Sequence, residues 1–140
     1  DLMRMSDVVV LCTPLTAQTE GLLDRAAFEQ MKRGAILINV ARGQCVVESE
    51  LIAALQKGYL GGAGVDVTLV EPLPAESPLW EMPNVIITPH VGAQSARRYD
   101  DVTDFFCENL RRRAAGLPLW NEVDKRLGFP APDRRRPHAL

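Results

Sequence analysis

The sequence lacks the features that mark several classes of protein. Its three cysteines, Cys12, Cys45 and Cys107, are odd in number and have no CxxC spacing, which predicts reduced thiols and no metal site. No apolar run approaches the roughly 18 to 20 residues that cross a membrane. The 16 basic and 18 acidic residues are scattered, so no long basic face is available for nucleic acid. These absences predict a cytoplasmic protein that has neither a membrane nor a nucleic acid as its partner.

The residues that are present suit one globular domain. The chain has 140 residues, of which 46% are hydrophobic, enough for a sizeable core. Residues 129–140, FPAPDRRRPHAL, lack a periodic apolar face, and we interpret them as a solvated tail rather than a basic arm for nucleic acid. The first residue is Asp1 and an apolar strand follows closely, so we expect the chain to be a piece of a longer protein.

Short apolar runs alternate with amphipathic segments along the chain. The predicted strands are residues 7–14, 34–41, 62–67 and 84–90. The predicted helices are residues 25–33, 48–58 and about 95–115, the first capped by Asp24 and the other two ended by Gly58 and Gly116. The last helix is expected to bury Val102, Phe105, Phe106 and Leu110. This alternation predicts the α/β class: a doubly wound parallel sheet, covered by helices on both faces and joined by right-handed crossovers.

A polar residue or a tight proline turn stands at the end of each predicted strand. Thr13 and Pro14 end the first strand, and Arg42, Asp66 and His90 lie at or near the ends of the next three. Taken singly, each has an ordinary explanation as a surface arginine, a turn residue or a loop histidine. Ligands of open parallel sheets bind beyond the carboxyl ends of the strands, however, so together these residues predict one site.

The residue types at this edge suit the handling of a 2-oxo acid. An arginine can hold a carboxylate by two parallel hydrogen bonds, and a histidine can give a proton to a carbonyl oxygen and take it back from the alcohol. Glu71 is the candidate carboxylate partner of that histidine. None of these groups supplies a hydride, so the chemistry requires a cofactor, and a doubly wound sheet favours a nicotinamide dinucleotide.

Five segments resemble the D-isomer-specific 2-hydroxyacid dehydrogenases, in the order and spacing of that family. They are LCTPLTAQTEGLL, MKRGAILINVARG, ELIAALQKGYLGGAGVDV, EPLPAESPLWEMPNVIITPHVGA and GLPLWNEVDKRLGF. Within the family, ARGQCVVESEL and NEVDKRLGF are most similar to glyoxylate and hydroxypyruvate reductases. The resemblance implies an oxidoreductase that uses NAD or NADP to reduce 2-oxo acids such as glyoxylate or hydroxypyruvate, and a homodimer in the full-length protein.

The resemblance also implies domains and residue roles. Residues 1–116 would be the C-terminal half of a Rossmann-like NAD(P)-binding domain, and 117–140 a C-terminal extension. The implied catalytic residues are Arg42, which binds the substrate carboxylate and carbonyl, His90, which donates and accepts the proton, and Glu71, its acidic partner. The implied cofactor-binding residues are Thr13, Pro14, Thr19, Ala41, Arg42, Asp66, His90 and Gly92, among which Asp66 would bond the nicotinamide carboxamide.

The chain departs from the family in what it lacks. It has no strand–GxGxxG–helix motif, because GYLGGAG lies between a helix and a strand rather than opening a helix. The ribose-binding acid that separates NAD from NADP and the separate substrate domain are missing as well. Two hypotheses follow: a reductase present here as a fragment, and a non-catalytic fragment or corepressor-like binding module of the same family. The 140 residues alone are expected to bind the cofactor weakly or not at all and to show no turnover.

Overall fold

The computed structural model describes residues 1–136, and their contacts divide the chain into two units. The first unit spans residues 1–92 and the second begins at Ala93. The boundary expected from the sequence lay at residue 116, which would have kept the long helix with the sheet. We describe each unit by itself.

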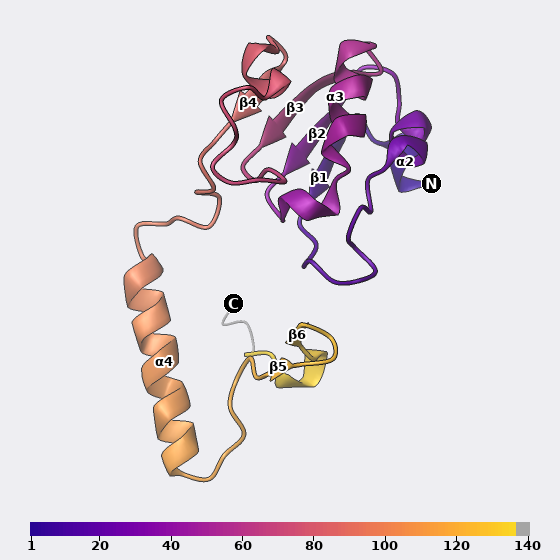
Figure 1. The fold of residues 1–140 in the computed structure, drawn as a ribbon. Helices are drawn as coiled ribbons and strands as arrows, with labels where there is room; N and C mark the ends of the chain where they lie inside the picture. The colour runs from indigo at the N-terminus through magenta and orange to yellow at the C-terminus, as the bar shows by residue number, and fades with distance from the viewer. Residues whose placement is uncertain (137–140) are drawn as a thin grey trace. The chain divides into compact units, whose positions relative to one another are not determined.

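Four parallel strands form the sheet of the first unit (Figure 1). They are β1 (Val8–Leu11), β2 (Ala35–Asn39), β3 (Leu60–Val65) and β4 (Val85–Ile87), and they lie in the order β1-β2-β3-β4. The last residues of the four strands pair in one row, Leu11 with Asn39, Asn39 with Val65, and Val65 with Ile87. The predicted parallel α/β sheet is confirmed, and its strands all end at the same edge.

Three α-helices belong to this unit: α1 (Leu2–Met5), α2 (Arg25–Gln30) and α3 (Glu48–Gln56). The predicted cap of α2 is confirmed, since the Asp24 side chain accepts a hydrogen bond from the Ala27 N–H at 2.9 Å. This helix is shorter than predicted, because Met31 adopts an extended backbone that turns its side chain into the core. The 3₁₀ turn η1 (Gly43–Cys45) follows β2, and a second 3₁₀ turn, η2 (Pro78–Glu81), precedes β4.

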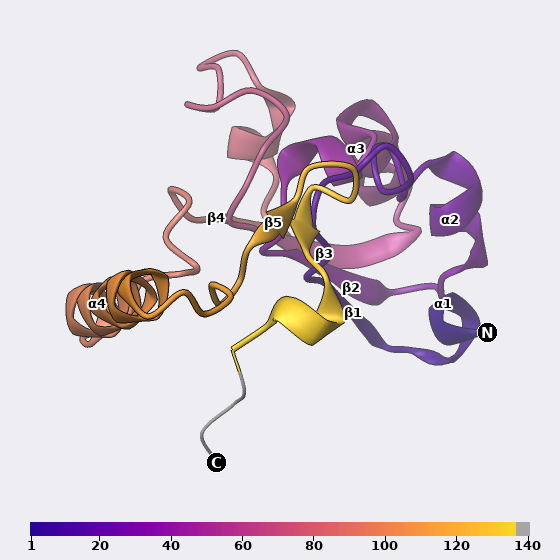
Figure 2. The same ribbon diagram turned by 90° about the horizontal axis from the view of Figure 1, so that it is seen from below.

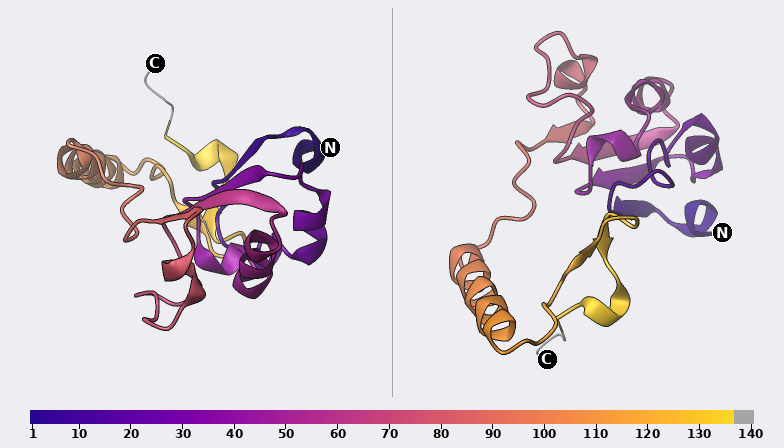
Figure 3. Two further views of the ribbon diagram at one scale, coloured as in Figure 1. Left: turned by 90° about the horizontal axis from the view of Figure 1, so that it is seen from above. Right: turned by 60° about the horizontal axis from the view of Figure 1, so that its bottom comes forward.

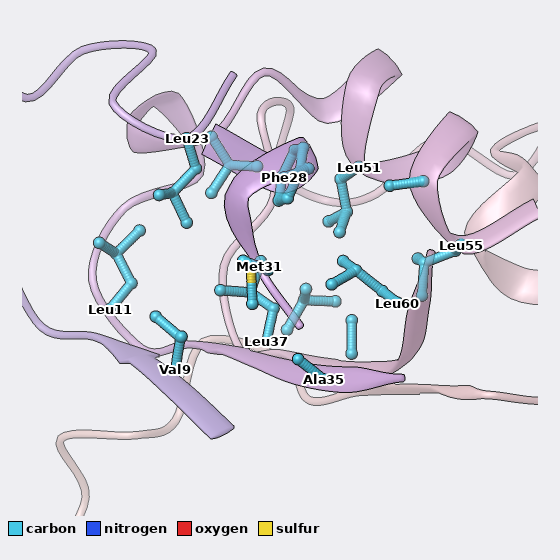
Figure 4. Close-up of a cluster of buried hydrophobic side chains, with 14 of the residues drawn as sticks. Val9, Leu11, Leu23, Phe28, Met31, Ala35, Leu37, Leu51, Leu55 and Leu60 are labelled. Carbon is cyan, nitrogen blue, oxygen red and sulfur yellow. The ribbon is translucent and has the colours of Figure 1, made fainter. Parts of the chain in front are cut away.

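The core lies between one face of the sheet and the helices α2 and α3 (Figure 4). Alternate residues of the strands point into it, and α2 and α3 add apolar side chains from the other side. Its members include Val9, Leu11, Leu37, Leu60, Phe28, Met31, Leu51 and Leu55. The buried side chains of this layer are the residues of each strand that face the helices.

The expected burial of both sheet faces is wrong for the described residues. Figures 2 and 3 show α2 and α3 on one side of the sheet, and side chains that point to the other side are exposed: Val8 by 50%, Val10 by 54%, Ile36 by 41% and Ile86 by 72%. The strands are apolar on both faces, so their sequence favours two layers of cover. Within residues 1–92 only one of those layers is supplied.

The second unit contains α4 (Arg98–Ala114), a two-stranded antiparallel ribbon of β5 (Val123–Asp124) and β6 (Phe129–Pro130), and the turn η3 (Pro132–Arg134). Gly116 follows α4 with a φ of +68°, as its role in ending the helix predicts. Part of the stretch interpreted as a solvated tail carries β6 and η3, and its last four residues lie outside the described part.

The predicted burial along α4 is wrong. None of its residues is buried, and Val102, Phe106 and Leu110 are each more than half exposed. Within the unit, polar and stacking contacts join α4 to the segment that follows it; for example, Asn109 exchanges two hydrogen bonds with the Trp120 backbone, and Arg112 stacks on the Trp120 ring at 4.1 Å. The apolar spacing of a helix shows which face is suited to burial, but not what covers it.

No helix among residues 1–136 is long and apolar enough to cross a membrane.

Candidate functional site

The common end row of the strands brings three of the predicted site residues to one edge. Arg42 follows β2, Asp66 follows β3 directly, and His90 comes three residues after the end of β4. A pocket of about 470 Å³ at this edge is lined by Asp66, Glu71 and His90. Its remaining lining includes the apolar side chains of Pro72, Leu73, Trp80 and Ile87. The position beyond the carboxyl ends of a parallel sheet is the one that the strand-end rule predicts.

The loop that carries Arg42 is held by a buried asparagine at the end of β2. Asn39 is 2% exposed; its Oδ1 accepts from the Ala41 N–H at 3.0 Å and its Nδ2 donates to the Arg42 carbonyl at 3.2 Å. The Arg42 side chain is exposed, and its Nη1 donates to the Ala41 carbonyl at 2.6 Å. The backbone of Arg42 is therefore fixed, while its guanidinium keeps further N–H donors for a ligand.

A close backbone approach joins this loop to the one after β3. A Cβ atom built on Gly43 would lie 1.9 Å from the Thr68 carbonyl oxygen, so only glycine fits between the two loops. A second link comes from the first turn of α3, where the Glu48 carboxylate accepts from the Leu69 N–H at 2.9 Å. Both contacts hold the segment that leads from Asp66 to Glu71.

Glu71 and His90 form a hydrogen-bonded pair. His90 Nδ1 lies 2.8 Å from Glu71 Oε2, and Glu71 Oε1 accepts from the Thr68 N–H at 3.1 Å. The bond from His90 lowers the pKa of Glu71 below its ordinary value, and the Thr68 amide and the charges of His90 and Arg42 act in the same direction. Since the ionised carboxylate only accepts hydrogen bonds, Nδ1 carries the hydrogen and Nε2 is the nitrogen left for proton exchange with a ligand.

Asp66 is buried, with only 7% of its surface exposed, and both of its carboxylate oxygens are bound by the chain itself. Oδ1 accepts from the Thr88 hydroxyl and, at 2.8 Å, from the Val91 N–H, and Oδ2 accepts from the Gly92 N–H at 2.7 Å. The Thr88 hydroxyl is the main cause of the lowered pKa of Asp66, and the two amides add to it against the opposing effect of burial.

The predicted residues after β1 lie in a loop that is braced internally. The Thr19 hydroxyl donates to the Pro14 carbonyl at 2.7 Å and accepts from the Thr16 N–H at 2.7 Å. The Thr13 hydroxyl oxygen is buried without a hydrogen-bond partner, and no other buried side-chain nitrogen or oxygen within residues 1–136 is in that state. An unpaired hydroxyl at a strand end is a group that a bound ligand or water would satisfy.

Sequence reasoning missed four residues that hold the site: Asn39, Gly43, Glu48 and Thr88. Asn39 could have been noticed, because it is the one polar residue in the apolar run of β2. The roles of the other three depend on contacts between segments distant in the chain, such as the one from Glu48 to Leu69, and no local pattern marks them.

The lowered pKa values of Asp66 and Glu71 predict a loss of stability in acid. Their ordinary values are 3.8 and 4.5, and folding depresses both. The resulting stabilisation is complete above those values and is lost as the pH falls through the lower pKa values of the folded state. The free energy of unfolding, measured with urea at a series of pH values, should therefore fall below about pH 4.5. The double variant D66N/E71Q should show a shallower fall, and an unchanged slope would contradict the assignment.

Comparison with known proteins supplies the family. A family model described as D-isomer specific 2-hydroxyacid dehydrogenase, NAD binding domain, matches residues 1–92. The chain belongs to this family. The 2-hydroxyacid dehydrogenase match ends at the same residue as the first structural unit.

Individual members of the 2-hydroxyacid dehydrogenase family are similar over most of the chain. Glyoxylate/hydroxypyruvate reductase A of Photorhabdus laumondii is 40% identical over 129 residues, which are 92% of this chain and 41% of that protein. An NADPH-dependent glyoxylate/hydroxypyruvate reductase from Sinorhizobium meliloti, solved with NADP and sulfate, superposes with a TM-score of 0.84 at 38% identity, covering 91% of this chain and 41% of that one.

A D-isomer specific 2-hydroxyacid dehydrogenase from Xanthobacter autotrophicus, solved with NADPH and MES, gives a TM-score of 0.82 at 45% identity, covering 87% of this chain and 50% of that one. These structures confirm the Rossmann-like fold. The chain spans about two fifths of the length of the curated relatives that it matches.

Proposed function

We infer that these residues serve an NAD(P)-dependent oxidoreductase that reduces small 2-oxo acids, with glyoxylate and hydroxypyruvate as its substrates. The observation that carries this proposal is the 2.8 Å contact between Glu71 and His90 at the strand-end edge, to which the loop after β2 brings Arg42. Membership in the 2-hydroxyacid dehydrogenase family and the names of the similar proteins support it.

Each of the three residues has a distinct task in the proposed reaction. Arg42 binds the substrate carboxylate through its exposed guanidinium and thereby places the neighbouring carbonyl. His90 gives the proton on Nε2 to the carbonyl oxygen in reduction and takes it back from the alcohol in oxidation. Glu71 holds Nδ1–H, so that the ring presents Nε2 to the substrate. One 2-oxo acid, one NAD(P)H and one proton give the 2-hydroxy acid and NAD(P)⁺.

The strand-end edge fits a dinucleotide in part. The unpaired Thr13 hydroxyl lies two residues after the end of β1, and the Ala41–Arg42 loop and Asp66 follow the two central strands. Thr13, Pro14, Thr19, Ala41, Arg42, Asp66, His90 and Gly92 are the residues proposed to hold it. A bound nicotinamide would supply the hydride. Assays of the complete protein with glyoxylate and hydroxypyruvate, following the oxidation of NADH or NADPH, test the proposal, and lack of turnover with both acids would refute it.

The same assays test the second hypothesis, a non-catalytic fragment or corepressor-like binding module. A corepressor-like module predicts binding of NAD(P)H, detectable by the cofactor's fluorescence, without oxidation in the presence of either acid, whereas a non-catalytic fragment predicts no oxidation. We further propose that the full-length protein is a homodimer of the cytoplasm, as its family membership suggests. Sedimentation of the complete protein at micromolar concentration checks the dimer.

Replacement of Arg42 by lysine should lower kcat/KM for glyoxylate by about 10- to 100-fold, with KM raised and kcat reduced. Lysine keeps the positive charge but cannot form two parallel hydrogen bonds to a carboxylate. Steady-state kinetics of the complete protein measures the effect. Arg25→Lys is a matched control, because Arg25 pairs with Glu29 on the exposed face of α2, away from the pocket of Glu71 and His90. Equal kinetics for R42K and wild type would remove Arg42 from the substrate site.

A further inference from the structure

We propose that Asp66 is a positioning residue for His90: its buried carboxylate closes the turn of residues 88–92 and so fixes the backbone from which the imidazole projects. The inference rests on the proposed function for the importance of His90, but the geometry behind it belongs to this chain alone. It also gives Asp66 a task besides the contact with a nicotinamide carboxamide that the family resemblance implies.

The backbone of His90 needs such support. Its φ is +54°, in the left-handed region where residues with a side chain are strained. The His90 N–H donates to the Thr88 carbonyl at 3.0 Å, which makes a tight turn directly after β4. A residue in this conformation persists only when its surroundings determine it.

The Asp66 carboxylate accepts hydrogen bonds from residues on both sides of His90 in the sequence. On one side of the histidine lies the Thr88 hydroxyl, and on the other lie the N–H groups of Val91 and Gly92. The chain can satisfy these three donors with one carboxylate only if residues 88–92 fold back over the end of β3. That fold places His90 at the apex of the turn.

Both ends of this arrangement are tied to the sheet. The Asp66 N–H donates to the Asn39 carbonyl at 2.9 Å, and the Thr88 N–H donates to the Val65 carbonyl at 3.0 Å. Asp66 and Thr88 are therefore both anchored to the ends of the strands. This anchoring fixes the position of the turn relative to Glu71 as well as its internal conformation. Asp66 fixes the backbone of His90, and Glu71 fixes its ring.

The glycine after the turn is the residue type that this contact requires. A Cβ atom on Gly92 would lie 2.8 Å from Asp66 Oδ2, too close for a side chain. The sequence PHVGA thus supplies a residue without a side chain where the carboxylate approaches the backbone. Oδ1 already accepts two hydrogen bonds and Oδ2 one, so with about two lone-pair positions per oxygen only Oδ2 keeps room for a further donor from a cofactor.

Amide hydrogen exchange of the ¹⁵N-labelled 140-residue chain tests the proposal without an activity assay. In D66N the amide nitrogen that replaces one oxygen cannot accept, so exchange at Val91 or Gly92 should accelerate by about tenfold or more. The strong NOE between the amide and α protons of His90, which a positive φ produces, should weaken at the same time. The amides of Thr88 and Val40, bonded to Val65 and Leu11, should keep their protection.

Asp7→Asn is the matched control, because it removes the same charge from an exposed carboxylate paired with Lys32. It should leave exchange at Val91 and Gly92 unchanged. T88V removes the hydroxyl donor and keeps the carboxylate; it should weaken the His90 NOE, and it keeps the test decisive should D66N fail to fold. Unchanged exchange and NOE in D66N, or in T88V if only that variant folds, would overturn the proposal. A complete protein without glyoxylate turnover would refute the proposed function but leave this result standing.

Discussion

In the complete protein, replacement of His90 by glutamine should lower kcat for glyoxylate by about 10²- to 10⁴-fold, the range that a positioned acid–base group contributes. Glutamine can still hydrogen-bond Glu71, but it has no nitrogen that releases a proton near neutral pH. KM should change little, because in the proposed reaction Arg42 rather than His90 binds the substrate carboxylate. Steady-state kinetics with glyoxylate measures the effect, and a separate assay with hydroxypyruvate repeats the measurement on another substrate.

Glu71→Gln provides a graded comparison for this prediction. The ring keeps its acid–base group but loses the ionised partner 2.8 Å from Nδ1, so the loss of kcat should be smaller than in H90Q. Fluorescence titration with NADPH shows whether either variant has lost the cofactor instead. Wild-type turnover in H90Q, with binding intact, would mean that another group donates the proton.

The second large effect is expected at Gly43. An alanine there would place its Cβ 1.9 Å from the Thr68 carbonyl oxygen. The nearest atoms all belong to the backbone of Thr68 and Leu69, so no side chain can rotate away to relieve the clash. The free energy of unfolding of G43A should fall by about 1–3 kcal/mol or more, as in other overpacked sites. Urea denaturation of the 140-residue chain measures it. The complete protein should also lose activity, since the loop that must move leads to Glu71.

Gly64→Ala is the matched control for this substitution. Its Cβ would lie 3.0 Å from Ile38 Cδ1, the far end of a side chain that can rotate away. G64A should therefore cost less stability than G43A. If the two variants were equally stable, the contact between Gly43 and Thr68 could not be a rigid one.

Local patterns were enough to predict the strands and the residues at their ends. Arg42, Asp66 and His90 could be found because apolar runs predict strands and the end of a parallel strand predicts a site. The prediction was wrong where a partner had to be known. α4 has an apolar stripe, yet Val102 and Phe106 are exposed, and Val10 and Ile86 are exposed on the sheet face that no helix of residues 1–92 covers. Periodicity reports which face suits burial, whereas the partner depends on the rest of the fold.

The supports of the site were out of reach for a different reason. Gly43 looks like any loop glycine, and its importance comes from Thr68, which lies in the loop after the next strand. Asp66 could be proposed as a ligand of the cofactor, but its bonds to Thr88, Val91 and Gly92 join segments more than 20 residues apart. Such contacts depend on how the strands pair in the fold and are not encoded in the local sequence around each residue.

The shared end row of the strands makes the Glu71–His90 contact a gauge of correct folding. Glu71 lies in the loop after β3 and His90 in the turn after β4, and the two strands pair at Val65 and Ile87. A slip of β4 by one residue would carry His90 about 3.3 Å along the sheet and turn the strand's side chains to the opposite face. A contact of 2.8 Å does not survive that displacement. A misregistered chain would therefore keep its strands and helices but lose the Glu71–His90 contact on which the proposed reaction depends.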